Sequence, residues 1–355
     1  MTLPGATVDG LLVEWGSRLF YPANRLVKSP PLPRLDTFMR RSAAVMRQRI
    51  RATVSRRAPQ VMVKVTGGGR GMGAIAAHFR YISKNGRLAF EDDRGEVRSG
   101  KEALHELAEH WRFGGSLIEE VSPRREAFNI MLSMPRGTDA QFVMKAAREF
   151  AQTELRDHRY VMVLHENQAN PHVHLSVRAE SSRGERLNPR KTDLHRWRET
   201  FAEKLRGWGV DAEATRQATR GANRNFEPLW RVKAKEQSRL RDPGRAAVKT
   251  GARVEATQNA AVQSWARIWQ ALQLSADPAD QRLAADVAQF MRAAPAFVLW
   301  RKQRDLARQQ VQKKHEAPRA IEKMAGASPK RTSLQPGPQP TINPDRDPRG
   351  PEMVR

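Results

Sequence analysis

Two neighbouring strand patterns, joined by a short turn, constrain the fold of this chain more than any other feature. Residues 159–166 and 172–180 have the composition and alternation of β-strands, and the turn 167–171 lies between them. A turn this short pairs the two strands as an antiparallel hairpin. Because helical patterns precede and follow the hairpin, the sequence predicts an α+β domain with a mainly antiparallel central sheet flanked by helices, not a doubly wound parallel sheet.

Hydrophobic spacing and turn residues predict the other elements of this domain. The predicted strands are 61–66 and 127–134, and the predicted helices are 72–83, 101–112, one capped at Thr138-Asp139 that reaches about Leu155, and one capped by Asp193.

Changes in composition divide the chain into four parts. Residues 1–59 are predicted to be a basic N-terminal arm that is ordered only in part, and 60–221 the folded domain. Residues 222–312 are predicted to be a helical, charged extension. The last part, 313–355, is polar and contains proline, glycine and arginine, so a disordered basic tail is expected there.

The composition narrows the partners that this chain can have. A formal net charge of +25 and a pI near 11.2 point to a polyanion, with nucleic acid ahead of an anionic membrane. No run of about 18 apolar residues and no secretory signal pattern is present, so we expect no membrane insertion and a cytoplasmic location. The chain has no cysteine, so any metal must be held by His, Asp, Glu or Asn.

Three of the nine histidines fall within the hairpin. Residues two apart on a strand share a face, so His172 and His174 point the same way while Val173 points to the other face. His165 ends the preceding strand and returns beside them. Three imidazoles can converge there on one ion and leave coordination positions open, as a catalytic metal site requires. The alternative is three solvent-facing hairpin histidines.

The predicted helix 72–83 carries Tyr81, one of three tyrosines in the chain. Ile75, Phe79 and Ile82 form the buried stripe of that helix, and Tyr81 lies off the stripe with His78 as its surface neighbour. Tyr81 is therefore the best placed nucleophile among the three tyrosines. The alternative is an ordinary residue at the rim of the core.

Two other motifs imitate known sites. His105 and His110 lie five positions apart, about 140° around a helix, so they cannot share an ion from one face as a zinc-protease helix does. The segment 69–74, which overlaps the glycine loop 67–71, fits a loose dinucleotide-binding pattern, but successive parallel strand–helix units are missing. Flexibility of the loop beside a DNA strand is the simpler interpretation.

The segment 164–175, with the sequence LHENQANPHVHL, resembles the metal motif of conjugative relaxases, the mobilisation nucleases of the His-hydrophobe-His endonuclease superfamily. The closest branch is the P-type, which includes the border endonuclease of agrobacterial T-DNA transfer. Three further stretches match in family order, 77–83 around the tyrosine, 131–135 in the middle strand and 187–191 before the last helix.

The resemblance implies site- and strand-specific DNA nicking by transesterification at a plasmid or integrative-element transfer origin. Tyr81 then forms a 5′-phosphotyrosyl intermediate, and His165, His172 and His174 hold a divalent metal ion. We expect Mg²⁺ or Mn²⁺, with Zn²⁺ as the alternative. In some relatives the histidine at the position of His165 is instead the base that takes the tyrosine proton, and both roles stay open.

This chain departs from the family in one position of the metal motif. Many relatives carry Asp two positions after the first histidine, where this chain has Asn167, with Glu166 one position earlier. Whether Glu166 replaces that carboxylate is open. The expected phosphate contacts are basic side chains near the tyrosine helix and after the hairpin, each of which could also be a solvated surface charge: Arg70, Lys84, Arg87, Arg190 and Lys191.

The resemblance also implies partners and a location. The expected partners are single-stranded origin DNA, accessory relaxosome proteins and the coupling protein of a secretion channel. The location is the bacterial cytoplasm, with transfer to a recipient cell alongside the DNA. Two alternatives are a rolling-circle replication initiator, which shares the chemistry, and a DNA-binding relative that has lost catalysis.

Overall fold

The structure, a computed structural model, forms two compact units, Met1–Arg301 and Lys302–Arg355. All the described strands and most of the described helices lie in the first unit, and the second contains the end of the last helix. The residues that the structure describes are 8–21, 42–166, 170–224, 234, 237–239 and 248–325, with side chains as far as 311.

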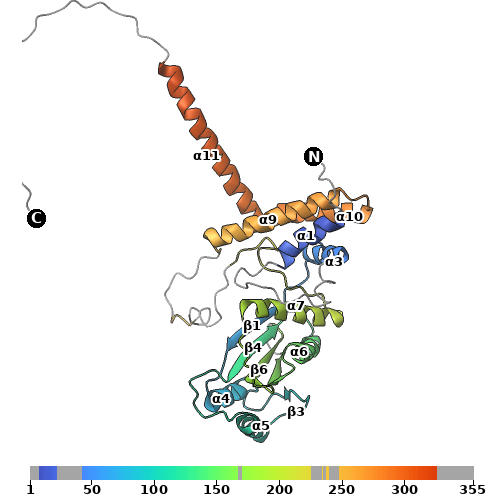
Figure 1. Ribbon diagram of the computed structural model, residues 1–355, viewed down its shortest axis with the longest axis vertical. Helices are drawn as coiled ribbons and strands as arrows, with labels where there is room; N and C mark the ends of the chain where they lie inside the picture. Colours follow the sequence, from blue (N-terminus) through green and yellow to red (C-terminus); the bar gives the residue numbers. More distant parts are fainter. Residues whose placement is uncertain are drawn as a thin grey trace, which may run out of the picture. The chain divides into compact units, whose positions relative to one another are not determined.

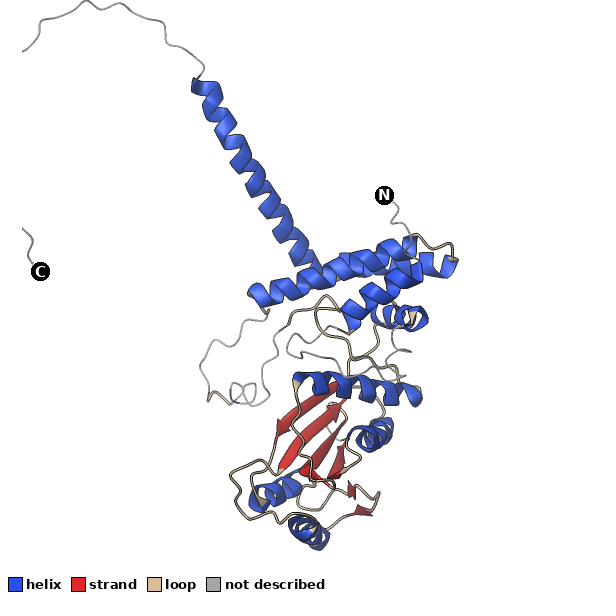
Figure 2. Ribbon diagram, viewed as in Figure 1, coloured by secondary structure: helices blue, strands red, loops and turns tan. Residues whose placement is uncertain are grey.

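Among the described residues, six strands form a single sheet in the order β1-β4-β6-β5-β2-β3, and each recorded pair is antiparallel (Figure 2). This confirms the predicted α+β class with an antiparallel sheet, and it excludes the dinucleotide-binding interpretation. The strands are β1 (Met62–Gly67), β2 (Phe90–Asp92), β3 (Val97–Arg98), β4 (Ala127–Ser133), β5 (His158–His165) and β6 (His172–Ser181).

Alternation along the strands gives each face of the sheet its own core. On one face, Val173 and Leu175 of β6 pack with α6 (Ala140–Glu154) and α7 (Lys191–Gly207). On the other face, Val163 packs with α4 (Met72–Ile82) and α5 (Lys101–Phe113). Figure 1 shows these helices around the central strands. The histidines of the hairpin share the face of α4, because they alternate with Val173 and Leu175.

A third core is built mainly from helices. It joins α1 (Val8–Phe20) and α3 (Ala43–Val54) to α9 (Ala252–Gln273) and α10 (Pro278–Ala293). Trp265 is fully buried in this core, and its indole N–H donates to the carbonyl of Thr219 at 2.8 Å. The final helix, α11 (Pro295–Ala325), follows α10.

Helices occur within the segments predicted as an N-terminal arm and a C-terminal tail. Residues 1–59 contain α1 and α3, whose apolar side chains recur at helical spacing, so these segments bury a stripe despite their positive charge. Helix α11 continues to Ala325, beyond the predicted end of the helical extension near 312, and residues 326–355 of the predicted tail lie outside the described part.

Candidate active site

The hairpin register brings the three predicted histidines together. His165 and His172 are direct partners across β5 and β6, and His174 lies two residues along the same face of β6. Their ring centroids are 4.7–5.0 Å apart, and one ligand nitrogen from each lies within 4.8 Å of the others. His165 and His172 are buried, and His174 is half-buried. The three side chains thus converge, as strand parity predicts.

Backbone carbonyls fix the ring orientation of two of these histidines. Nε2 of His165 donates to the carbonyl of Ile82 at 2.6 Å, and Nδ1 of His172 donates to the carbonyl of Asn170 at 2.9 Å. A carbonyl can only accept, so each ring carries its proton there and keeps a lone pair on its other nitrogen. Metal-binding histidines are oriented in this way by hydrogen bonds from the nitrogen that does not bind the metal.

The free nitrogens of the cluster lack other partners. Nδ1 of His165 and Nδ1 of His174 are buried, and neither has a hydrogen-bond partner among the described residues. Burial is the main cause that lowers the pKa of His165 and lowers the pKa of His174 to about 3, and the neighbouring imidazoles add to the effect on His174. These rings are therefore neutral at physiological pH, the form that binds a metal, and the donor set fits a divalent cation.

Tyr81 lies beside the cluster on α4. Its side chain is 70% exposed, and its ring centroid is 6.5 Å from that of His174. His78, one turn earlier, stacks on Tyr81 at 6.1 Å with an angle of 29° between the rings, and its own centroid is 6.4 Å from that of His174. The early helix and the later hairpin thus place an accessible phenol next to the three imidazoles.

The position of α4 depends on contacts at both of its ends. At its start Gly71 has a φ of +97°, and a Cβ there would lie 2.3 Å from the carbonyl oxygen of Glu120. This part of the glycine loop is therefore closely packed, which differs from the flexible loop expected from the sequence. At its end, the hydrogen bond from His165 holds the carbonyl of Ile82, the residue after Tyr81. Helix α4 and the histidine cluster are thus directly connected.

The predicted phosphate ligands are all exposed, but they occupy different places. Lys84 follows Tyr81 after α4 and lies close enough to His165 to act on it electrostatically. Arg87 follows Lys84 in the same turn. The guanidinium of Arg70 donates to the carbonyl of Pro123 at 2.6 Å, so this side chain is held against the loop that contains Pro123.

Two predicted phosphate ligands lie at the start of α7. Arg190 and Lys191 begin this helix, which packs on the face of the sheet opposite the histidines. The backbone N–H of Arg190 donates to the carboxylate of Asp193 at 2.8 Å. Asp193 is therefore not the capping residue itself, as predicted from the sequence, but lies in the first turn, where its carboxylate still satisfies the start of the helix.

The acidic residue of the metal motif lies apart from the histidines. Glu166 directly follows β5, is exposed, and is not among the side chains that converge with the three imidazoles. Asn167 lies outside the described residues. His105 and His110, the rejected zinc-helix pair, are both exposed on α5. No role was expected for His78 beyond contact with Tyr81, although it also lies beside His174.

Comparison with known proteins supports a family assignment. Residues 82–210 match the family described as "Relaxase: MobA/VirD2-like, nuclease domain". A solved structure described as "Molecular Basis of Vancomycin Resistance Transfer in Staphylococcus aureus" is similar at 16% identity with a TM-score of 0.29, over 45% of this chain and 99% of that one. The search of curated proteins gave no match.

The match covers the whole hairpin and its histidines, and it begins at the last residue of the tyrosine helix. Among the described residues, no helix combines the length and apolar character needed to cross a bilayer. Over residues 82–210 the chain is thus similar to the nuclease domain of the MobA/VirD2-like relaxases.

Proposed function

We propose that this protein nicks one DNA strand at a transfer origin by transesterification and remains attached to it through Tyr81. One observation carries the proposal: the ring centroid of an exposed phenol lies 6.5 Å from that of His174, which belongs to a cluster of three histidines with one ligand atom each within 4.8 Å of the others. A buried tyrosine could not reach a strand, and a phenol without a cation nearby would attack a phosphodiester poorly. The family match favours transfer over replication initiation.

In the proposed reaction, the Tyr81 oxygen attacks the scissile phosphorus. A bond forms between the phenol oxygen and phosphorus, and the bond from phosphorus to the 3′ oxygen breaks. The phenol loses its proton and the departing strand gains one, which leaves a free 3′-hydroxyl and a 5′-phosphotyrosyl end. One ester replaces another, so the strand can later be rejoined by the reverse reaction.

His165, His172 and His174 would hold the divalent ion. When bound, the ion would polarise the scissile phosphate and offset the charge that develops during the attack. Three imidazole donors suit Mn²⁺ or Zn²⁺ better than Mg²⁺, which prefers oxygen ligands, so we expect Mn²⁺ to support the reaction best.

The hydrogen bonds favour a ligand role for His165 over the role of base. Its Nε2 donates to the carbonyl of Ile82, and its Nδ1 has no hydrogen-bond partner among the described residues, so Nδ1 is the nitrogen that would bind the ion. Neither nitrogen is therefore left to take the phenol proton. We infer that His165 both binds the ion and positions the end of α4, the helix that carries Tyr81.

The DNA strand would be held by exposed cations around this centre. The net charge of +25 supports a polyanionic partner, and Lys84 and Arg87 directly follow the tyrosine helix. We further expect origin DNA, accessory relaxosome proteins and a coupling protein as partners. The expected location is the bacterial cytoplasm, with transfer to a recipient cell during conjugation.

A covalent-adduct assay tests this function. The protein is incubated with Mn²⁺ and labelled single-stranded oligonucleotides that tile the DNA flanking its own coding sequence, and adducts are separated by denaturing electrophoresis. We expect one oligonucleotide to give an adduct that Tyr81→Phe abolishes and EDTA prevents. Tyr160→Phe is the matched control, because Tyr160 is buried on the opposite face of β5.

Two results would contradict the proposal. The first is the absence of an adduct with every oligonucleotide and with Mn²⁺, Mg²⁺ and Zn²⁺ alike, which would support a relative that has lost catalysis. The second is an adduct that persists in Tyr81→Phe, which would move the nucleophile to another residue.

A further inference from the structure

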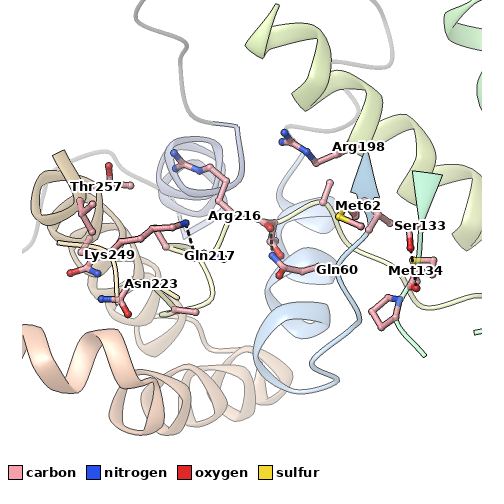
Figure 3. A pocket seen from close by; sticks show the side chains of 18 of the residues that line it. Gln60, Met62, Ser133, Met134, Arg198, Arg216, Gln217, Asn223, Lys249 and Thr257 are labelled. Carbon is pink, nitrogen blue, oxygen red and sulfur yellow. Dashed lines mark hydrogen bonds between the residues drawn. The ribbon is translucent and has the colours of Figure 1, made fainter. Parts of the chain in front are cut away.

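A large cavity adjoins the histidine cluster in the first unit. Its volume is about 930 Å³, within the range of ligand pockets. One wall contains Met62 of β1 and Ser133 at the end of β4, and another contains Lys249 and the start of α9 (Figure 3). The cavity therefore lies between the end of the sheet and the helical core, and the sequence pattern does not reveal it.

Two residues of the cavity wall are direct neighbours of the proposed metal site. Ser133 is the strand partner of His172 across β4 and β6. The carbonyl of Asn170, another residue of the cavity wall, accepts the hydrogen bond that orients the His172 ring. The cavity therefore lies next to the place where a strand would be bound at the histidines.

The lining carries one sign of charge. Arg198 of α7, Arg216, Lys249 and Arg253 of α9 all line the cavity, and none of its described lining residues is acidic. Arg198 and Arg216 are half-buried, whereas Lys249 and Arg253 are exposed. Cations thus lie both inside the cavity and at its exposed rim, where they can meet successive phosphates of one strand.

The two inner arginines lack the partners that other arginines of this fold have. Arg196, two residues before Arg198, pairs with Glu154 and Asp193. No hydrogen bond or ion pair joins the guanidinium of Arg198 or Arg216 to a described residue, and Nε of Arg216 is buried without a partner. Burial lowers the pKa of both groups, which means that their charged forms are poorly solvated.

Apolar side chains complete the lining. Val61, Met62, Met134 and Pro135 lie on the sheet side of the cavity, and Val254 lies on the helix side. Nucleotide bases can pack against such a surface while the phosphates meet the arginines. A small inorganic anion would leave this apolar surface uncovered.

We propose that this cavity binds single-stranded DNA next to the nick site, with Arg198 and Arg216 as ligands of its phosphates. This inference rests on the proposed function, because the strand in the cavity is the one that the protein nicks. The cavity thereby holds the DNA on one side of Tyr81 through contacts that do not take part in the chemistry.

Binding of oligothymidylates in EDTA tests the cavity apart from nicking. Fluorescein-labelled (dT)20 is titrated with wild type, with Arg198→Gln/Arg216→Gln, and with Arg282→Gln/Arg292→Gln by anisotropy. The last variant is the matched control, because it removes the same charge from exposed positions of α10 that do not line the cavity.

We expect the cavity variant to bind (dT)20 at least 10-fold more weakly at about 0.1 M salt. The loss of two phosphate contacts should also reduce the slope of log K against log salt by about 1.4. The control should change affinity less than 2-fold. Arg198→Lys/Arg216→Lys keeps the charge, so it should bind (dT)20 more tightly than the Gln variant. Such a recovery would show that the loss in the Gln variant does not come from misfolding.

Three outcomes would overturn the cavity proposal: unchanged binding in the Gln variant, equal weakening in the α10 control, or displacement of (dT)20 by a free nucleotide at equimolar concentration. The last outcome would assign the cavity to nucleotides. Because no cleavage occurs in EDTA, a negative adduct assay and a negative cavity test are separate results.

Discussion

Arg49 connects the helical core to the sheet domain through a buried pair of carboxylates. Its guanidinium donates to Glu199 of α7 at 3.0 Å and to Glu213 at 3.1 Å. The three side chains are 7%, 6% and 4% exposed. The same guanidinium lies over the ring of Phe20 at 4.9 Å. Burial alone would lower the pKa of Arg49, but the two glutamates raise it above its usual range, so the cation stays charged.

Replacing Arg49 by Met tests how much this connection contributes to the free energy of unfolding. The Met side chain fills part of the same space but leaves Glu199 and Glu213 buried without a cation. Breaking a buried pair in this way costs about 3–5 kcal/mol of stability. Arg18→Met is the matched control, because Arg18 pairs with Glu14 at 2.8 Å with side chains that are 59% and 48% exposed. Such an exposed pair contributes about 0–1 kcal/mol.

Urea unfolding followed by tryptophan fluorescence measures both losses from the shift in midpoint. The loss in Arg49→Met should depend on pH. An unpaired buried carboxylate is costly in its charged form, so the penalty should be full near neutral pH and should shrink in acid, where protonation removes the charge. Adding Glu199→Gln and Glu213→Gln to Arg49→Met should restore much of the stability.

Equal losses of stability in Arg49→Met and Arg18→Met would refute this account, and so would a penalty in Arg49→Met that grows as the pH falls. Either result would mean that water reaches the carboxylates and that the connection contributes little.

Two shorter predictions concern the metal centre and one glycine. Mn²⁺ at 100 times its Kd should stabilise the wild type by about 2.7 kcal/mol in thermal unfolding, and His172→Ala should remove most of this stabilisation whereas His105→Ala on α5 should keep it. Gly221→Ala should lose more than Gly209→Ala in the same assay, since both have a positive φ but only a Cβ at Gly221 would meet Ala294, at 2.4 Å. Equal losses at the two glycines would show that the Ala294 contact relaxes without cost.

Local spacing predicted the parts of the site that depend on one element. The parity of the hairpin placed His172 and His174 on one face, and the helical stripe of 72–83 left Tyr81 outside the core. Both inferences need only the repeat of a strand or a helix, which any sequence displays directly. The order of the longer strands and helices from β1 to α7 followed for the same reason.

Other features depend on contacts that no local pattern contains. Strands β2 and β3 are three and two residues long, too short to show alternation. In α3 the charged Arg49 faces the core, where it pairs with Glu199 and Glu213. Both partners lie far from Arg49 in the sequence, so the local pattern does not reveal the pairing. A segment rich in arginine is therefore predicted as an exposed arm until those partners are known.

The hydrogen bond between His165 and Ile82 shows why the sequence left two roles open for His165. Strand parity placed His165 near the other histidines, but it gave no information about which ring nitrogen was free. That choice depends on a carbonyl 83 residues away in sequence, at the end of the helix that carries Tyr81. Since the same hydrogen bond orients the ring and holds the helix, a change at His165 should disturb both the ion and the position of the nucleophile. His174 has no such bond from its Nδ1 among the described residues, so a change there should act on the ion and on the ring contacts with Tyr81 and His78, and not through the carbonyl of Ile82.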